Sequence, residues 1–88
     1  MTKAQFHRIS KALADPMRYQ ILSRIAARDE LACSNLRCTL PITPATLSHH
    51  IKELTGAGLI EVRKTSKFMH MKLRAKVWKD YLATLSKL

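Results

Sequence analysis

The sixteen residues from Thr43 to Gly58 constrain the fold most, because they specify a helix together with both of its ends. Thr43 is a residue type that caps helix N-termini, and Pro44 suits the first turn, where a helix does not use the missing N–H. Gly58 can take the left-handed conformation that commonly ends a helix. The segment is therefore predicted to be a short helix with a defined start and stop.

The two faces of this predicted helix differ in character. Apolar residues recur at helical spacing on one face: Leu47, Ile51 and Leu54. The opposite face carries small polar or charged side chains: Thr46, Ser48, His49, Lys52 and Glu53. Such a face is rich in hydrogen-bonding groups and poor in bulk, as a helix inserted into a DNA groove requires. His50 falls at the edge of the apolar stripe, where packing or a hydrogen bond within the helix-turn-helix is expected.

Net charge is high for a chain of this size. Sixteen Lys and Arg against six Asp and Glu leave +10 in 88 residues. The basic residues are interleaved with periodic apolar ones, so the charge is expected on a folded surface of one domain spanning residues 1–88. An excess of this kind favours a polyanionic partner, either nucleic acid or an anionic membrane surface.

Patterns outside this segment predict the remaining elements. Helical periodicity is found over about residues 3–14, 16–27, 34–40 and 75–88, and Asp15-Pro16 is a strong capping junction between the first two helices. Two-residue alternation follows Gly58, in residues 59–63 and 68–73. The predicted fold is mainly α with a small β-hairpin: a winged helix-turn-helix with about five helices.

The hairpin turn is basic, and it follows directly after the polar-faced helix. Arg63, Lys64 and Lys67 are expected at this wing, where they would contact the DNA backbone or minor groove. The residues predicted to bind double-stranded DNA are Thr43, Thr46, Ser48, His49, Lys52, Arg63, Lys64 and Lys67.

Two apolar stripes lie in the terminal helices. Their members are Phe6, Ile9 and Leu13 in the first helix, and Trp78, Tyr81, Leu82 and Leu85 in the last. An 88-residue domain can cover only part of such stripes, so they are predicted to form the interface of a homodimer.

Several classes of protein are not indicated. The chain has no Ser-His-Asp or Cys-His pairing in a suggestive context and no Gly-rich phosphate loop, so neither an enzyme nor a bound cofactor is expected. It also has no run of 18 apolar residues and no signal-peptide pattern. A cytoplasmic protein without a membrane partner is therefore predicted.

Three segments together resemble the ArsR/SmtB family of repressors. They are Leu13-Ala-Asp-Pro-Met-Arg, Ala45-Thr-Leu-Ser-His-His-Ile-Lys-Glu-Leu and Ala57-Gly-Leu-Ile, and the similarity runs from about residue 10 to residue 74. The resemblance implies a homodimer paired through its first and last helices. It also implies that each subunit places its recognition helix in the major groove with the wing alongside.

The sequence departs from the family pattern at the sensor positions. Members that sense soft metals have a Glu-Leu-Cys-Val-Cys-Asp-Leu run, whereas this chain has Glu30-Leu-Ala-Cys-Ser-Asn-Leu36. Members that sense zinc or nickel use Asp and His in the last helix, but no histidine follows His70 here. The wing turn has Ser66 where the family often has Gly. No metal site is expected.

Two alternatives stay open on the sequence alone. The chain could be a winged-helix module for protein or RNA contacts, with the charge as a general tether for polyanions. It could also be a thiol- or metal-responsive repressor that uses Cys33 and Cys38, although a spacing of five places these residues on different faces of a helix.

Overall fold

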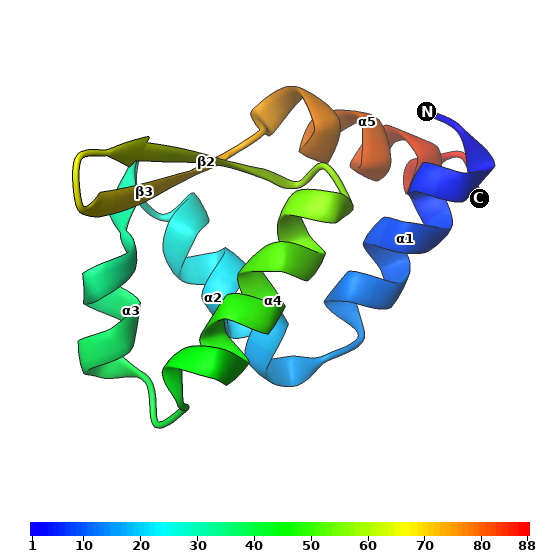
Figure 1. Cartoon of the computed structure of the whole chain (residues 1–88). Coiled ribbons are helices and arrows are strands. Elements are labelled where there is room, and N and C mark those ends of the chain that lie inside the picture. The colour runs from blue at the N-terminus through cyan, green and yellow to red at the C-terminus, as the bar shows by residue number, and fades with distance from the viewer.

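A computed structural model describes residues 1–88 and contains five helices and a three-stranded sheet (Figure 1). The elements in chain order are α1 (Lys3–Leu13), α2 (Pro16–Ala26), β1 (Leu31–Ala32), α3 (Cys33–Thr39), α4 (Pro44–Gly56), β2 (Ile60–Thr65), β3 (Phe68–Leu73) and α5 (Ala75–Ser86). This arrangement confirms the predicted winged helix-turn-helix, and most bounds differ from the expected ones by only one or two residues.

The sheet has one more strand than predicted. Its strands are all antiparallel and lie in the order β1-β3-β2, with β2 and β3 paired from Ile60↔Leu73 to Thr65↔Phe68. Strand β1 adds two residue pairs, with Leu31 opposite Met71 and Ala32 opposite His70. Two residues are too short to show an alternating pattern, which is why the sequence did not indicate β1.

The predicted alternation along β3 is confirmed. Met71 is buried, while Phe68 and Lys72 on the opposite face of the strand are exposed. A two-residue turn, Ser66-Lys67, joins β2 to β3, and Ser66 takes the left-handed conformation with φ 55°. Ser66 thus adopts a backbone conformation that glycine takes more readily.

Local side-chain hydrogen bonds set the starts of three helices. The side chains of Thr2, Asp15 and Thr43 each accept a hydrogen bond from a backbone N–H of the first turn of α1, α2 and α4 respectively. These bonds satisfy N–H groups that have no partner within the helix. The capping roles predicted for Asp15 and Thr43 are confirmed.

The end of α4 has the hydrogen-bond pattern of a Schellman motif. The N–H of Leu59 donates to the carbonyl of Leu54 at 3.1 Å, and the N–H of Gly58 donates to the carbonyl of Thr55 at 3.0 Å. Gly58 has φ 81°, so it supplies the left-handed residue that this motif needs. The motif turns the chain from α4 directly into the wing.

One hydrophobic core joins the helices to the inner face of the sheet. Its fully buried large side chains come from α1 to α4, from β2 and β3, and from the residue just before β2: Ile9, Ile21, Ile25, Leu36, Leu47, Leu54, Leu59, Ile60 and Met71. Helix α5 is attached through Tyr81, whose hydroxyl lies 2.8 Å from Ser10 Oγ of α1 and whose ring lies 5.1 Å from that of Phe6. None of the helices has the length and apolar character needed to cross a membrane.

Candidate nucleic-acid interface

Helix α4 has one buried and one exposed face. Leu47, Ile51 and Leu54 are buried, as predicted, and they fix the helix on the core. Of the five polar residues predicted for the other face, Thr46, Ser48, His49 and Lys52 are exposed and Glu53 is half-buried. A rigidly held helix with hydroxyl, imidazole and ammonium groups on its free side can reach base edges and phosphates in a groove.

Thr43 and Thr46 are coupled at the start of this helix. Thr43 Oγ1 accepts a hydrogen bond from the Thr46 N–H at 3.2 Å and donates one to Thr46 Oγ1 at 2.9 Å. The Thr43 hydroxyl therefore serves as the helix cap, whereas the Thr46 hydroxyl keeps its own proton available for an external acceptor.

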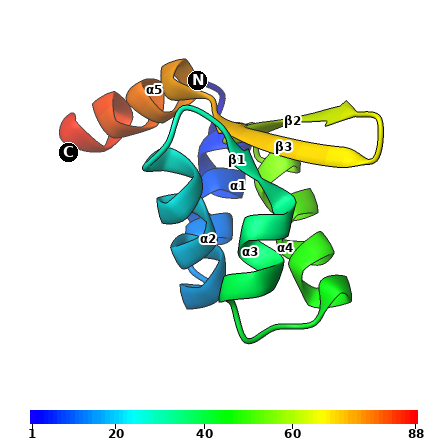
Figure 2. The ribbon, with the colours of Figure 1, turned by 90° about the vertical axis from the view of Figure 1, so that its left-hand side faces the viewer.

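The wing lies on the same side of the molecule as α4. Figure 2 shows the tip of the β2–β3 hairpin projecting on the side where α4 lies, with α5 on the opposite side. Lys64 and Lys67 are exposed at or next to this tip, in β2 and in the turn. The exposed lysines of the wing and the polar face of α4 thus lie on the same side of the molecule.

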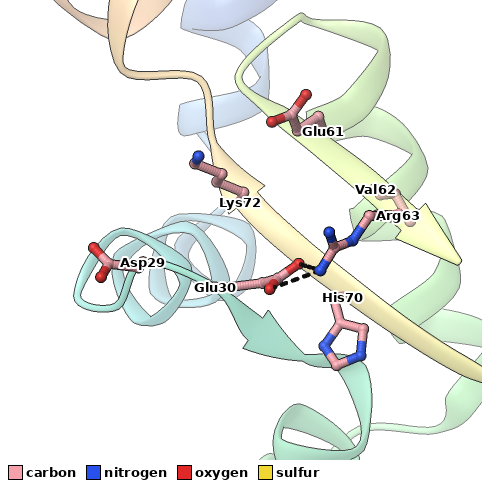
Figure 3. Close-up of a pocket in the computed structure, with 7 residues that line it drawn as sticks. All are labelled: Asp29, Glu30, Glu61, Val62, Arg63, His70 and Lys72. Carbon is pink, nitrogen blue, oxygen red and sulfur yellow. Dashed lines mark hydrogen bonds and ion pairs between the residues drawn. The ribbon is translucent and has the colours of Figure 1, made fainter. Parts of the chain in front are cut away.

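Arg63 of the wing forms an ion pair within the protein. Its Nη2 binds both carboxylate oxygens of Glu30, at 2.7 and 3.0 Å, in the only salt bridge of the molecule. Glu30 lies in the loop between α2 and β1, and the pair crosses the outer face of the sheet (Figure 3). Unlike the lysines, Arg63 therefore has a carboxylate partner in the protein, which the sequence did not predict.

The outer face of the sheet also holds a concavity of about 450 Å³. Its lining mixes both signs of charge: Asp29, Glu30, Glu61, Val62, Arg63, His70 and Lys72 (Figure 3). The carboxylates beside it would repel phosphate, so this concavity is not assigned to the nucleic-acid surface.

His50 is the only polar or charged residue among the buried ones. Its Nδ1 accepts a hydrogen bond of 3.3 Å from Nε of Arg18, at the start of α2. Burial lowers the pKa of His50, and the nearby charges of Arg18 and His49 lower it further, whereas Asp15 raises it. The expectation that His50 packs and bonds within the domain is confirmed, but the sequence did not identify Arg18 as its partner.

The apolar residues of the terminal helices are not equally accessible. Ile9 and Tyr81 are 0% and 5% exposed, so they lie inside the protomer, and Phe6, Leu13 and Trp78 are half-buried against the core. Leu82 and Leu85 are 44% and 36% exposed on α5. Only part of the predicted interface set is therefore free to contact another molecule, with Ile9 and Tyr81 supporting it from behind.

A further exposed aromatic residue, Tyr19 of α2, was missed. It is 56% exposed and lines a small groove with Leu22, Leu73 and Trp78, next to α5. The sequence could have indicated this exposure, because Tyr19 lies away from the apolar stripe of the second helix and an aromatic side chain there does not reach the core.

The two cysteines differ in their exposure to solvent. Cys33 is buried at the start of α3, and Cys38 is exposed near its end; both are free thiols. No three His, Cys, Asp or Glu side chains are grouped so that they could hold a metal ion.

A capped recognition helix, a basic wing on the same side and a helical core beneath them define a winged helix-turn-helix DNA-binding protein. A family model described as a helix-turn-helix domain matches residues 13–63, more than half of the chain. The chain is 35% identical over 75 residues to the uncharacterized HTH-type transcriptional regulator YceK of Bacillus subtilis (strain 168), which covers 84% of this chain and 75% of that protein.

Solved structures show the same fold. An ArsR-like transcriptional regulator from Rhodococcus sp. RHA1 matches with a TM-score of 0.84 and 23% identity, over 96% of this chain and 78% of that one. The homodimeric winged helix-turn-helix DNA-binding domain Mb0332 from Mycobacterium bovis, a possible ArsR-family regulator, matches with a TM-score of 0.77 and 25% identity, over 94% and 77%. The chain belongs to the helix-turn-helix transcriptional regulators, which are not an enzymatic class, and its fold is the one found in ArsR-like regulators.

Proposed function

We propose that this protein is a transcriptional repressor that binds an inverted-repeat operator as a homodimer. The observation that carries the proposal is the exposed polar face of α4, which shares one side of the molecule with the lysines of the wing. A repressor of this kind blocks a promoter simply by occupying it, which fits a small domain acting on DNA in the cytoplasm.

The chemistry of the side chains on this surface assigns some of them to base edges and others to phosphates. Ser48 and His49 are exposed on α4 and carry groups that can bond to a base edge, so they are assigned to sequence recognition. Lys52, Lys64 and Lys67 carry compact charges and are assigned to phosphates, together with the hydroxyl of Thr46. Arg63 joins them only where DNA displaces Glu30 from its guanidinium.

A second copy of the chain is proposed to bind through α5 and the neighbouring part of α1. Leu82 and Leu85 leave an exposed apolar strip that water would otherwise cover, and half-buried Trp78 extends it. The related Mycobacterium bovis domain is homodimeric. Two recognition helices placed about 34 Å apart would read half-sites one helical turn apart, which is why an inverted repeat is expected.

Selection of bound fragments from a random DNA pool tests the proposal, followed by affinity measurements on the selected and on random duplexes. A repressor should prefer its selected site by about 10³ or more, and the site should be an inverted repeat. Binding of all duplexes with equal, salt-sensitive affinity would instead support a general polyanion-binding or RNA-interaction module.

Substitutions on the two parts of the surface should behave differently. Ser48→Ala or His49→Ala should cost about 1–3 kcal/mol on the selected site if each contact is to a base. Lys64→Ala or Lys67→Ala should weaken all duplexes alike and reduce the salt slope by about one unit per lost phosphate contact. Arg28→Ala is the matched control, because this basic residue is exposed in the loop between α2 and β1, outside α4, the wing and the proposed dimer helices.

A further inference from the structure

The recognition helix contains a buried titratable group. His50 is 7% exposed and lies on the buried side of α4, directly after Ser48 and His49 of the exposed side. An imidazole is a polar group whose burial costs free energy unless it is hydrogen-bonded. Its hydrogen-bond partner is Arg18, which comes from a different helix.

This hydrogen bond connects α4 to a fixed point of the fold. Asp15 caps α2 by accepting the Arg18 N–H at 3.0 Å, which holds the Arg18 backbone at the first turn. The Arg18 side chain then reaches α4, where Nε donates to His50 Nδ1 at 3.3 Å. A guanidinium can only donate hydrogen bonds, so the contact requires Nδ1 to carry a lone pair and the ring to be neutral.

We propose that Arg18 and His50 are a positioning pair that holds α4 in its DNA-binding orientation only while His50 is neutral, so that mild acid releases the operator. The inference rests on the operator binding proposed above. Protonation at Nδ1 removes the acceptor and places a second positive charge against Arg18 in a buried position. The link between α2 and α4 is then replaced by repulsion.

The surroundings of His50 favour this behaviour. Charged groups that act on it are Asp15 and Arg18 from the start of α2 and His49 from its own helix, and none comes from α1, α3 or β2, which also pack against α4. Burial is the largest effect and lowers the pKa of His50 from the ordinary value of 6.5; Asp15 acts in the opposite direction. His50 is therefore neutral near pH 7, and α4 is linked to α2.

General electrostatics predicts the opposite response to acid. Acid adds positive charge to a chain that already carries +10 and whose exposed basic side chains attract phosphate. Acid should then strengthen binding to any duplex. Because His50 is buried, its added charge acts on Arg18 and not on phosphate, so the expected response of operator binding is opposite to that of charge added on the exposed surface.

The size of the effect follows from proton linkage. If only the neutral form is competent to bind, the apparent affinity is multiplied by the fraction of free protein in which His50 is neutral. Below the pKa of His50 this fraction falls tenfold per pH unit. Each subunit of the proposed homodimer carries one His50 and both must be neutral, so operator affinity should fall with a limiting slope of about two decades per pH unit.

The experiment measures operator affinity between pH 5.5 and 8 for the wild type, His50→Asn and His49→Asn. Asparagine at position 50 keeps an oxygen acceptor for Arg18 but cannot be protonated in this range. We expect the wild type and His49→Asn to lose affinity in acid. His50→Asn should bind within about threefold of the wild type at pH 8 and show no acid loss. Acid-strengthened wild-type binding, or an unchanged acid loss in His50→Asn, would overturn the proposal.

A second measurement uses the wild type without DNA, so it needs neither a folded variant nor an operator. Imidazole ¹⁵N shifts should show His50 with its proton on Nε2 at pH 8, and backbone amides of α4 should shift with the same midpoint as the His50 titration. Amides that ignore this titration would refute the positioning role. Absence of any preferred DNA sequence at pH 8 would instead contradict the proposed function, and the measurement without DNA would still decide whether His50 positions α4. Circular dichroism at each pH separates helix release from unfolding, which acid also favours because the unfolded state protonates His50 more readily.

Discussion

Gly58 provides a sharp test of how the recognition helix joins the wing. Its φ of 81° is a conformation that costs an L-residue with a side chain about 1–2 kcal/mol. A Cβ added there would also meet Gln5 Nε2 of α1 at 2.9 Å. That atom is the end of a flexible side chain, so Gln5 can move away and the backbone strain is the main effect.

The net change for Gly58→Ala is smaller than the strain alone. Replacing glycine reduces the freedom of the unfolded chain, which offsets about 0.4–1 kcal/mol of the cost. A net loss of about 1 kcal/mol of unfolding free energy is expected, which lowers Tm by about 4–8 °C in a domain of this size. Operator affinity well below Tm should change little if the Schellman motif is strained but kept.

Gly56→Ala is the matched control, since this glycine lies in the last turn of α4 and has no positive φ. Alanine is a better helix former than glycine by about 0.5–1 kcal/mol. The added Cβ would lie 2.5 Å from Arg8 Nη2, the end of an exposed side chain that can swing aside. Gly56→Ala should therefore leave Tm unchanged or raise it.

Thermal and urea unfolding at one fixed protein concentration would measure both variants, because the stability of a dimer depends on concentration. The reasoning would be refuted if Gly58→Ala were as stable as the wild type. A drop of equal size in both variants would mean that loss of space near α1, rather than the left-handed backbone, sets the cost.

Three further predictions concern the surfaces of the domain. Leu82→Asp should yield monomers in sedimentation that have lost the preference for an inverted repeat. The variant should still fold, because the Leu82 side chain is 44% exposed. A dimer of unchanged affinity would contradict the proposed interface. Glu30→Gln should free Arg63 and raise the affinity for all duplexes, with a salt slope steeper by up to about one unit. The stability of the domain should change by no more than about 1 kcal/mol. Unchanged DNA binding would show that Arg63 does not reach phosphate. Cys33→Ser combined with Cys38→Ser should leave DNA binding insensitive to low micromolar Zn²⁺ and to peroxide, as in the wild type, and release of the wild type alone would make the thiols a switch.

Helix starts and stops could be predicted from the sequence because they depend on neighbours. The caps of α2 and α4 use side chains that bond to an N–H three residues away, and the end of α4 needs one residue that tolerates a positive φ. The buried stripe of α4 and the alternation of β3 likewise repeat over three, four or two residues. These features carry the winged helix-turn-helix fold and the choice of α4 as the recognition helix.

Long-range pairings depended on the tertiary structure. Arg18 and His50 are 32 residues apart, and Glu30 and Arg63 are 33 apart, so no local pattern links either pair. A basic residue near a helix start and another in a wing look alike in the sequence, yet one binds a buried histidine and the other a carboxylate. The packing of α2 on α4, and of the α2–β1 loop across the sheet, decides which partner each one meets.

The same distinction applies to the apolar stripes of α1 and α5. Helical spacing identifies Ile9, Tyr81, Leu82 and Leu85 as apolar positions, but it does not say which of them a single subunit covers. Docking of α5 on α1 buries Tyr81 beside Ser10 and leaves the two leucines exposed. Periodicity specifies the face of an element, whereas the relative placement of two elements determines how much of that face remains available to a partner.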